Sequence, residues 1–321
     1  MKQKFVLGLS ILLALIVAGA GWFIAPYLLR VERFPADPAQ GYYADFYLYV
    51  SPKAQRAARA GQPVTILVQP NNSGTNSDDP EVHQRDAWWT GFERYSIAND
   101  LGVILLVPAF VRPGTDWHIY SHALDRDTLT TARPDVGRLD LQLIAMVDTA
   151  RARLEKDGIM AEEKFLIQGF SASGMFANRF TAMHPERVKA VTAGSPGGWP
   201  ILPLAEQSGT RLNYPIGIAD LEQLTGKPFD AEAFNQVPQL IYMGSADDND
   251  SLDFIDGWEP EMAAIVDELF GETPLERWDD VEAAYKSAGA SVEFLLIDGI
   301  GHDRRALQHH STIFFEKILD R

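Results

Sequence analysis

Two serines stand inside a run of small residues at 169–174, Gly-Phe-Ser-Ala-Ser-Gly, directly after an apolar stretch. A serine hydroxyl attacks a carbonyl carbon when a sharp strand-to-helix turn exposes it and a base removes its proton. Such a turn needs small residues two before and two after the nucleophile, because backbones approach closely there. Counted from Ser171, these positions are Gly169 and Ser173. Counted from Ser173, the second position is Met175, whose side chain is too large. Ser171 is therefore the predicted nucleophile; the alternative is a glycine loop in which it only caps a helix.

The base that would activate this serine is predicted to be His302, in a glycine-flanked loop just after the last predicted strand. A neutral imidazole takes the serine proton during attack and later returns it to the leaving group. In triads built on such a strand-turn-helix scaffold, nucleophile, acid and base follow one another along the chain. The remaining histidines either precede the serine or fall in or near helices: His83, His118, His122, His184, His309 and His310.

Asp247 is the predicted acid, and it follows a predicted strand at 239–244. A carboxylate at this point would orient the imidazole and stabilise its charged form. Asp250, in the same acidic turn, is the alternative acid. A calcium-binding loop is excluded, because a loop starting at Asp247 would place Leu252 and Trp258 where glycine and glutamate are needed. We therefore expect no metal at this site.

Two backbone N–H groups must face the oxyanion that forms when the serine attacks. One is expected from Ala172, the residue after the nucleophile. The other is expected from the loop after a strand at 63–70, where Asn72 or Asn71 would supply it, since asparagine tolerates unusual backbone angles. The alternative is that these asparagines only form the turn.

Segments of strand length alternate along the chain with segments of helical periodicity. The predicted strands cover residues 45–52, 63–70, 102–110, 164–169, 188–197, 239–244 and 291–299. The predicted helices cover residues 83–100, 135–158, 173–187, 275–289 and the closing segment at 312–321. This alternation predicts an α/β fold, with a mostly parallel central sheet and helices on both of its faces.

The span between the strands near 190 and 240 is too long for a simple crossover. Connections of this length are usually functional, so we predict a cap or lid insertion at about 198–237, over the carboxyl edge of the sheet. The alternative is a packing extension with no part in binding.

The first thirty residues differ from the rest of the chain. Residues 5–29 form an uncharged segment that is long enough for a membrane-spanning helix. Residues 1–30 are therefore predicted to be an uncleaved signal anchor, with 31–41 as a linker and 42–321 as the enzyme domain. The alternative is a signal peptide cleaved after the small residues at 18–20. The domain would lie outside the cytoplasm, membrane-anchored in the first case and secreted or periplasmic in the second.

The net charge and the absence of cysteine limit which partners and which chemistry the chain can have. The 321 residues carry a formal net charge of −16, and the only charged residues among the first thirty are basic, so the acidity belongs to the predicted domain. An acidic surface repels phosphate backbones, so nucleic-acid binding is not expected. The absence of cysteine excludes disulfides and thiolate catalysis. Composition leaves the oligomeric state open.

With these motifs in this order, the chain resembles the α/β-hydrolase superfamily from about residue 42 to 318. Within that superfamily it is similar to the secreted esterase group that includes feruloyl esterases and polyhydroxyalkanoate depolymerases. It departs from the group at residues 69–72, Gln-Pro-Asn-Asn, where a His-Gly pair is common, and in having no cysteine. The resemblance implies Ser171, Asp247 and His302 as the triad, with no cofactor.

Three functions follow from these observations. The first is a serine hydrolase that cleaves carboxylic esters, either small molecules or polymer ends. The second is a serine peptidase or aminopeptidase of the same fold. The third is a catalytically inactive, membrane-tethered binding protein, which the presence of all three triad residues disfavours.

Overall fold

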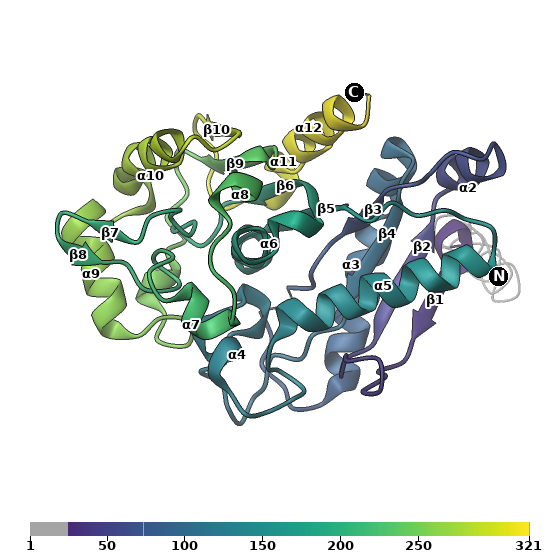
Figure 1. The fold of residues 1–321 in the computed structure, drawn as a ribbon, viewed down its shortest axis with the longest axis horizontal. Helices are drawn as coiled ribbons and strands as arrows, with labels where there is room; N and C mark the ends of the chain where they lie inside the picture. The colour runs from purple at the N-terminus through teal and green to yellow at the C-terminus, as the bar shows by residue number, and fades with distance from the viewer. Residues whose placement is uncertain (1–24, 73, 321) are drawn as a thin grey trace, which may run out of the picture.

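An eight-stranded sheet forms the centre of the described chain, which comprises residues 25–72 and 74–320 (Figure 1). Its strands lie in the order β1-β2-β4-β3-β5-β6-β9-β10. Their bounds are Val31–Phe34 (β1), Phe46–Val50 (β2), Ile66–Val68 (β3), Ile104–Pro108 (β4), Phe165–Phe170 (β5), Val188–Gly194 (β6), Gln239–Gly244 (β9) and Val292–Ile297 (β10). β2 is antiparallel to both of its neighbours, and all pairs from β4 to β10 are parallel. The predicted fold class, with its mostly parallel sheet, is confirmed.

Helices cover both faces of this sheet. Their bounds are Pro52–Arg59 (α2), Pro80–Leu101 (α3), Arg126–Thr130 (α4), Leu139–Lys156 (α5), Ala172–Met183 (α6), Leu221–Thr225 (α7), Ala231–Gln236 (α8), Pro260–Phe270 (α9), Pro274–Ala288 (α10), Arg304–Leu307 (α11) and His309–Leu319 (α12). Successive side chains of a strand point to opposite faces, so Leu106 and Leu105 of β4 lie in two different apolar cores. The core around Leu106 includes α5, α6 and α10, and the core around Leu105 includes α3 and α12.

The structure differs from the predicted linker at residues 31–34, which form strand β1. β1 pairs antiparallel with β2, from Val31 opposite Tyr49 to Phe34 opposite Phe46. The ring of Phe34 stacks on that of Phe46, with centroids 4.5 Å apart. The nearby prolines indicate a linker, but the two apolar side chains bind the segment to the edge of the sheet.

The end of the predicted anchor segment lies against the domain. Tyr27 is 1% exposed and contacts the rings of four residues: Tyr49, Trp88, Phe92 and Tyr95. The remainder of the anchor, up to residue 24, lies outside the described residues. In residues 25–72 and 74–320, no helix combines the length and the apolar character that crossing a bilayer requires. The anchor stays a prediction.

Residues 198–237, the predicted cap, connect β6 to β9. They contain a two-stranded ribbon of β7 (Glu206–Gln207) and β8 (Thr210–Arg211), followed by α7 and α8. Several of their side chains are buried in the larger core: Trp199, Ile201, Leu202, Leu212, Tyr214, Ile216, Leu221 and Phe234. This burial shows that the segment is an integral part of the domain. Its role as a lid stays a prediction.

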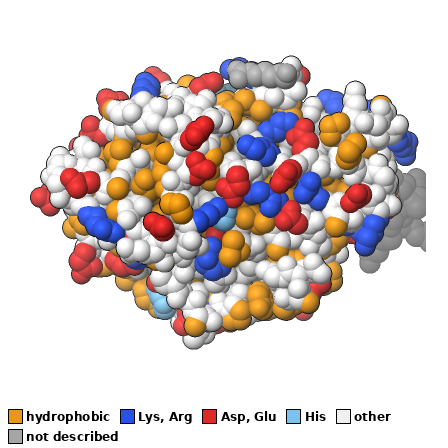
Figure 2. Space-filling model, viewed as in Figure 1, with side chains coloured by type: hydrophobic (Ala, Val, Ile, Leu, Met, Phe, Trp, Pro, Cys, Tyr) orange, Lys and Arg blue, Asp and Glu red, His pale blue; other side chains and the backbone are white. Residues whose placement is uncertain are grey.

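The surface carries both signs of charge. On the face shown in Figure 2, Lys and Arg side chains are interspersed with Asp and Glu side chains. A mixture of this kind forms no continuous basic area on this face that could follow a nucleic-acid backbone.

Candidate active site

Ser171 occupies a strained turn between β5 and α6. Its backbone angles are φ 59° and ψ −128°, a region that residues other than glycine rarely adopt. Two hydrogen bonds hold the turn: the Ser171 N–H donates to Gly194 O at 2.9 Å, and the Met175 N–H donates to Ser171 O at 3.0 Å. A non-glycine residue persists in such a conformation only when its surroundings impose it.

Close backbone contacts explain the small residues of this turn. A Cβ atom on Gly169 would lie 1.8 Å from Ser173 O, and one on Gly174 would lie 2.7 Å from Gly194 O. Ser173 is buried, and its hydroxyl accepts a hydrogen bond from the Phe170 N–H at 3.0 Å and lies 2.9 Å from Phe170 O, to which it donates. The Ser173 hydroxyl is therefore engaged in closing the turn, although both serines line the same pocket.

His302 and Asp247 meet at the carboxyl edge of the sheet, after β10 and β9. His302 Nδ1 lies 3.0 Å from both carboxylate oxygens of Asp247. Because a carboxylate accepts, Nδ1 carries the proton, which leaves Nε2 as the basic nitrogen of the neutral ring. Burial alone would raise the pKa of Asp247, but the hydrogen bond from His302 opposes this effect, and that pKa lies below its usual range.

Asp250, the alternative acid, has a different partner. Its Oδ2 accepts a hydrogen bond from Arg277 Nη1 at 2.5 Å, and both side chains are buried. Its Oδ1 accepts from the Leu252 N–H at 3.0 Å, which caps a short helical turn. The structure therefore places Asp247, and not Asp250, in hydrogen bond contact with His302.

The two candidate oxyanion asparagines have different environments. Asn71 is fully buried, and its side chain exchanges two hydrogen bonds with the Phe110 backbone, at 3.0 and 3.1 Å. Asn72 lines the pocket, and its Nδ2 donates to Phe170 O at 3.2 Å. Ala172 is the first residue of α6, so its N–H belongs to the first turn, which has no partner within the helix. Asn71 thus anchors the loop, and Asn72 joins it to the residue before Ser171.

A buried histidine supports the same loop. His122 Nε2 lies 3.1 Å from Asn71 Nδ2 and 2.9 Å from Phe110 O. Burial lowers the pKa of His122 to about 3, so the ring is neutral. His122 was expected to play no part in the triad, and the structure instead gives it a role in packing beneath the asparagines.

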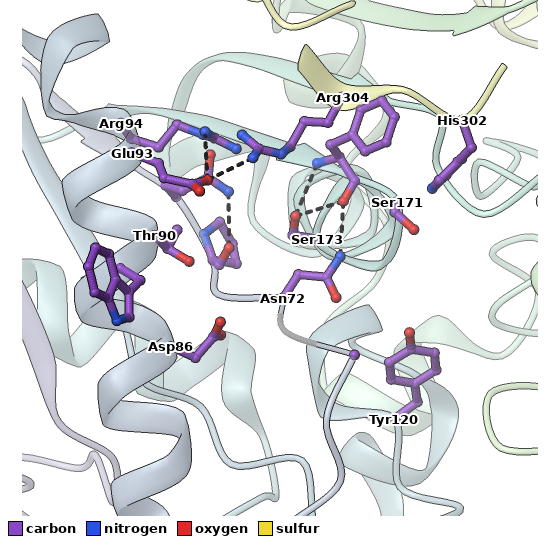
Figure 3. A pocket seen from close by; sticks show the side chains of 15 residues that line it. Asn72, Asp86, Thr90, Glu93, Arg94, Tyr120, Ser171, Ser173, His302 and Arg304 are labelled. Carbon is purple, nitrogen blue, oxygen red and sulfur yellow. Dashed lines mark hydrogen bonds and ion pairs between the residues drawn. The ribbon is translucent and has the colours of Figure 1, made fainter. Parts of the chain in front are cut away.

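Ser171 and His302 both line a pocket of about 450 Å³ (Figure 3). The His302 ring also packs on the Phe170 ring, with centroids 4.8 Å apart. Asn72, Ser173 and Tyr120 line the same cavity. Among the described residues that line it, none belongs to 198–237.

One face of α3 forms a wall of this pocket, which the sequence did not reveal. The residues that line it have the spacing of a single helical face: Asp86, Trp89, Thr90, Glu93 and Arg94. Burial raises the pKa of Asp86 to about 6. Arg304, two residues after His302, closes this wall through a 2.7 Å contact with Glu93. The polar residues at 86, 90 and 94 are the signal that could have identified the wall.

Clusters of three or more histidine and acidic side chains that could hold a metal ion are absent from residues 25–72 and 74–320.

Comparisons with known proteins bear on the fold. No protein-family model matches the chain, and no curated protein does so. Among solved structures, poly(aspartic acid) hydrolase-1 from Sphingomonas sp. KT-1 is 20% identical, with a TM-score of 0.58 over 88% of this chain and 97% of that one. A poly(3-hydroxybutyrate) depolymerase from Bordetella parapertussis is 21% identical, with a TM-score of 0.55 over 90% of each chain. Together with the sheet order and the turn at Ser171, these likenesses show that the chain has the α/β-hydrolase fold.

Proposed function

We propose that the protein is a serine hydrolase that cleaves carboxylic esters through an acyl-enzyme. The observation that carries the proposal is the position of His302, which is held by Asp247 at 3.0 Å and shares one pocket with the strained Ser171. A histidine held by a buried carboxylate, in the same pocket as a half-buried serine on a tight turn, is the arrangement that activates a hydroxyl.

In the proposed first step, Ser171 Oγ attacks the ester carbonyl carbon and His302 Nε2 takes its proton. The C–O bond to the alcohol then breaks, and His302 returns the proton to the departing alcohol. A water molecule repeats the sequence on the acyl-enzyme, which releases the acid and restores Ser171. Asp247 keeps His302 in the required tautomer and stabilises the imidazolium that forms twice in the cycle.

The negative oxygen of each tetrahedral intermediate needs two N–H donors. We assign them to the backbone of Ala172, at the start of α6, and of Asn72. The support for Asn72 is its contact with Phe170 O and the rigid attachment of Asn71 to Phe110, which together fix the loop beside Ser171. Asn71 itself is buried, so we assign it an anchoring role and not a donor role.

An ester is proposed as the target, with a small molecule or a polymer end as the substrate. One similar structure is named for a poly(3-hydroxybutyrate) depolymerase and another for a poly(aspartic acid) hydrolase. We also propose that the predicted anchor at residues 5–29, whose end packs on the domain at Tyr27, tethers the domain outside the cytoplasm, on the basis of its uncharged sequence.

The test is labelling of the full chain with a fluorophosphonate, alongside hydrolysis of 4-nitrophenyl butyrate. Ser171→Ala should abolish labelling and lower kcat by at least about 10³-fold, because the attacking oxygen is missing. Ser208→Gly is the matched control, since Ser208 is exposed and its φ of 52° suits glycine. Labelling of Ser171→Ala at the wild-type level would refute the proposal. Hydrolysis of aminoacyl amides without any hydrolysis of esters would instead assign the protein to the serine peptidases.

A further inference from the structure

Arg94 is a buried cation in the wall of the candidate active site. It lies on α3, lines the pocket and is 6% exposed. A guanidinium has five N–H donors and stays charged at neutral pH. Its acidic partner in the described part of the chain is Glu93, with Nη1 and Oε2 3.7 Å apart, longer than a hydrogen bond. A buried charge that is paired so weakly is costly, and this cost calls for another anion.

The nearest carboxylate is already engaged by a second cation. Glu93 Oε2 accepts a hydrogen bond from Arg304 Nη2 at 2.7 Å. Figure 3 shows Arg94, Glu93 and Arg304 together at one end of the pocket. Burial, and next the charge of Arg304, lower the pKa of Arg94 to about 10, so Arg94 is still protonated at neutral pH. Two cations and one anion leave this end of the pocket with one positive charge in excess.

The other acidic group of the pocket lies away from this end. Asp86 precedes Arg94 by eight residues on α3, which corresponds to about 12 Å along the helix axis. Thr90 lies between them, and Figure 3 shows Asp86 at the opposite end of the wall. Asp86 therefore does not neutralise Arg94, but together with Glu93 it would repel a ligand that carries two negative charges.

We infer that Arg94 binds a carboxylate of the substrate, so that the preferred esters carry one free carboxylate in the part that enters the pocket. The planar guanidinium fork matches the two oxygens of a carboxylate, and the single excess charge suits a monoanion. A neutral ester of the same size would leave the buried charge with only its 3.7 Å contact to Glu93. The inference rests on the proposed ester hydrolysis and adds the chemical class of the substrate.

The experiment compares two esters of equal chain length, hydrogen 4-nitrophenyl adipate and methyl 4-nitrophenyl adipate, with the full chain as the enzyme. The wild type should show the higher kcat/KM for the hydrogen ester. Arg94→Met should lower kcat/KM for that ester by about ten- to a hundredfold, which is the usual loss for a hydrogen bond to a charged group. The value for the methyl ester should change by less than about threefold, because no charge pair is lost.

Two further variants separate recognition from folding. Arg94→Lys keeps the charge without the fork, and it should restore part of the preference. Arg85→Met removes an exposed charge from the same helix outside the pocket, and it should leave both rates unchanged. Thermal melts identify any variant that does not fold. If Arg94→Met does not fold, the ratio of kcat/KM for the hydrogen ester to kcat/KM for the methyl ester in Arg94→Lys decides.

The outcomes distinguish this inference from the proposed function. If the wild type reacts with fluorophosphonate but does not favour the hydrogen ester, the inference is wrong and the serine hydrolase stands. Equal losses for both esters in Arg94→Met and Arg94→Lys would also overturn it, since Arg94 would then only support the pocket. Absence of fluorophosphonate labelling at Ser171 would overturn the proposed function, and the inference with it.

Discussion

Gly244 and Ile300 lie so close together that a Cβ atom on Gly244 would be 1.9 Å from the Ile300 carbonyl oxygen. Gly244 ends β9, three residues before Asp247, and Ile300 stands two residues before His302. This contact brings together the two loops that carry the hydrogen bond between Asp247 and His302. The 3.0 Å distance between His302 Nδ1 and the Asp247 carboxylate therefore depends on residue 244 having no side-chain methyl group.

Gly244→Ala should consequently separate the loops. We expect a loss of about 1–3 kcal/mol in the free energy of unfolding, as for other overpacked sites. We also expect kcat to fall while fluorophosphonate still reacts slowly with Ser171. Urea denaturation and steady-state kinetics measure the two effects. Gly299→Ala is the control, because its Cβ would meet no atom within 4 Å, although its φ of +70° adds local strain. Unchanged kinetics in Gly244→Ala would contradict this account.

Replacement of aspartate by asparagine should have different effects at the two candidate acids. Asp247→Asn should lower kcat by about 10⁴-fold with little loss of stability, because the amide favours the wrong imidazole tautomer. Asp250→Asn should instead destabilise the fold by about 3 kcal/mol, since it weakens a buried pair with Arg277. Kinetics and thermal melts of both variants test this pair of predictions. A larger kinetic loss in Asp250→Asn would reverse the assignment.

Ser173→Ala should resemble neither of these variants. It removes the two hydrogen bonds to Phe170 that close the turn, at an expected cost of about 1–2 kcal/mol. Labelling by fluorophosphonate should persist, because Ser171 keeps its hydroxyl. Loss of labelling in a folded Ser173→Ala protein would show that the nucleophile had been misassigned.

Asp86 should make stability depend on pH. Burial raises the pKa of Asp86 from its ordinary value of 3.8 to about 6, so the folded state holds the proton more tightly than the unfolded state. Stability then falls as the pH rises from about 4 to 6, and the penalty persists above that range. Asp86→Asn should raise Tm at pH 7 and have little effect at pH 4. An equal change of Tm at both pH values would exclude ionisation as the cause.

Tyr27 should be needed for the stability of the domain. Tyr27→Ala should cost about 3–4 kcal/mol, because it removes a large buried ring from among four aromatic neighbours. Leu29→Ala, at a position that is 84% exposed, is the control and should change Tm little. A chain that begins at residue 31 should melt like Tyr27→Ala. Equal melting of that chain and the wild type would refute the prediction.

The sequence predicted the sheet well because its central strands are buried on both faces. The run of β4 is apolar throughout, β5 is buried along its whole length, and glycines lie near the ends of β5 and β9. The same regularity allowed Ser171, Asp247 and His302 to be proposed, since each lies a few residues beyond a strand end. Strand β1 escaped prediction because it is four residues long and is held mainly by its pairing with β2.

The polar residues at 86, 90 and 94 mark one face of a helix, but periodicity alone does not show that this face lines the active site. α3 is hydrophobic on parts of several faces, and only its packing on the sheet decides that Asp86, Thr90 and Arg94 turn toward Ser171. The different roles of Asn71 and Asn72 likewise depend on residues that are distant in the sequence, since Asn71 is held by Phe110, which lies 39 positions away. Contacts of this kind depend on tertiary structure, so a local pattern does not determine them.

The burial of Tyr27 against α3 has a mechanical consequence. Gly91 makes room for it, since a Cβ there would lie 2.1 Å from the Tyr27 hydroxyl, and α3 carries the pocket wall along another face. The chain enters β1 only four residues later, without a loose spacer. Tyr27 therefore fixes the start of the described chain to the same helix that carries the pocket wall. A change at this contact would act on the position of α3, and through α3 on the pocket.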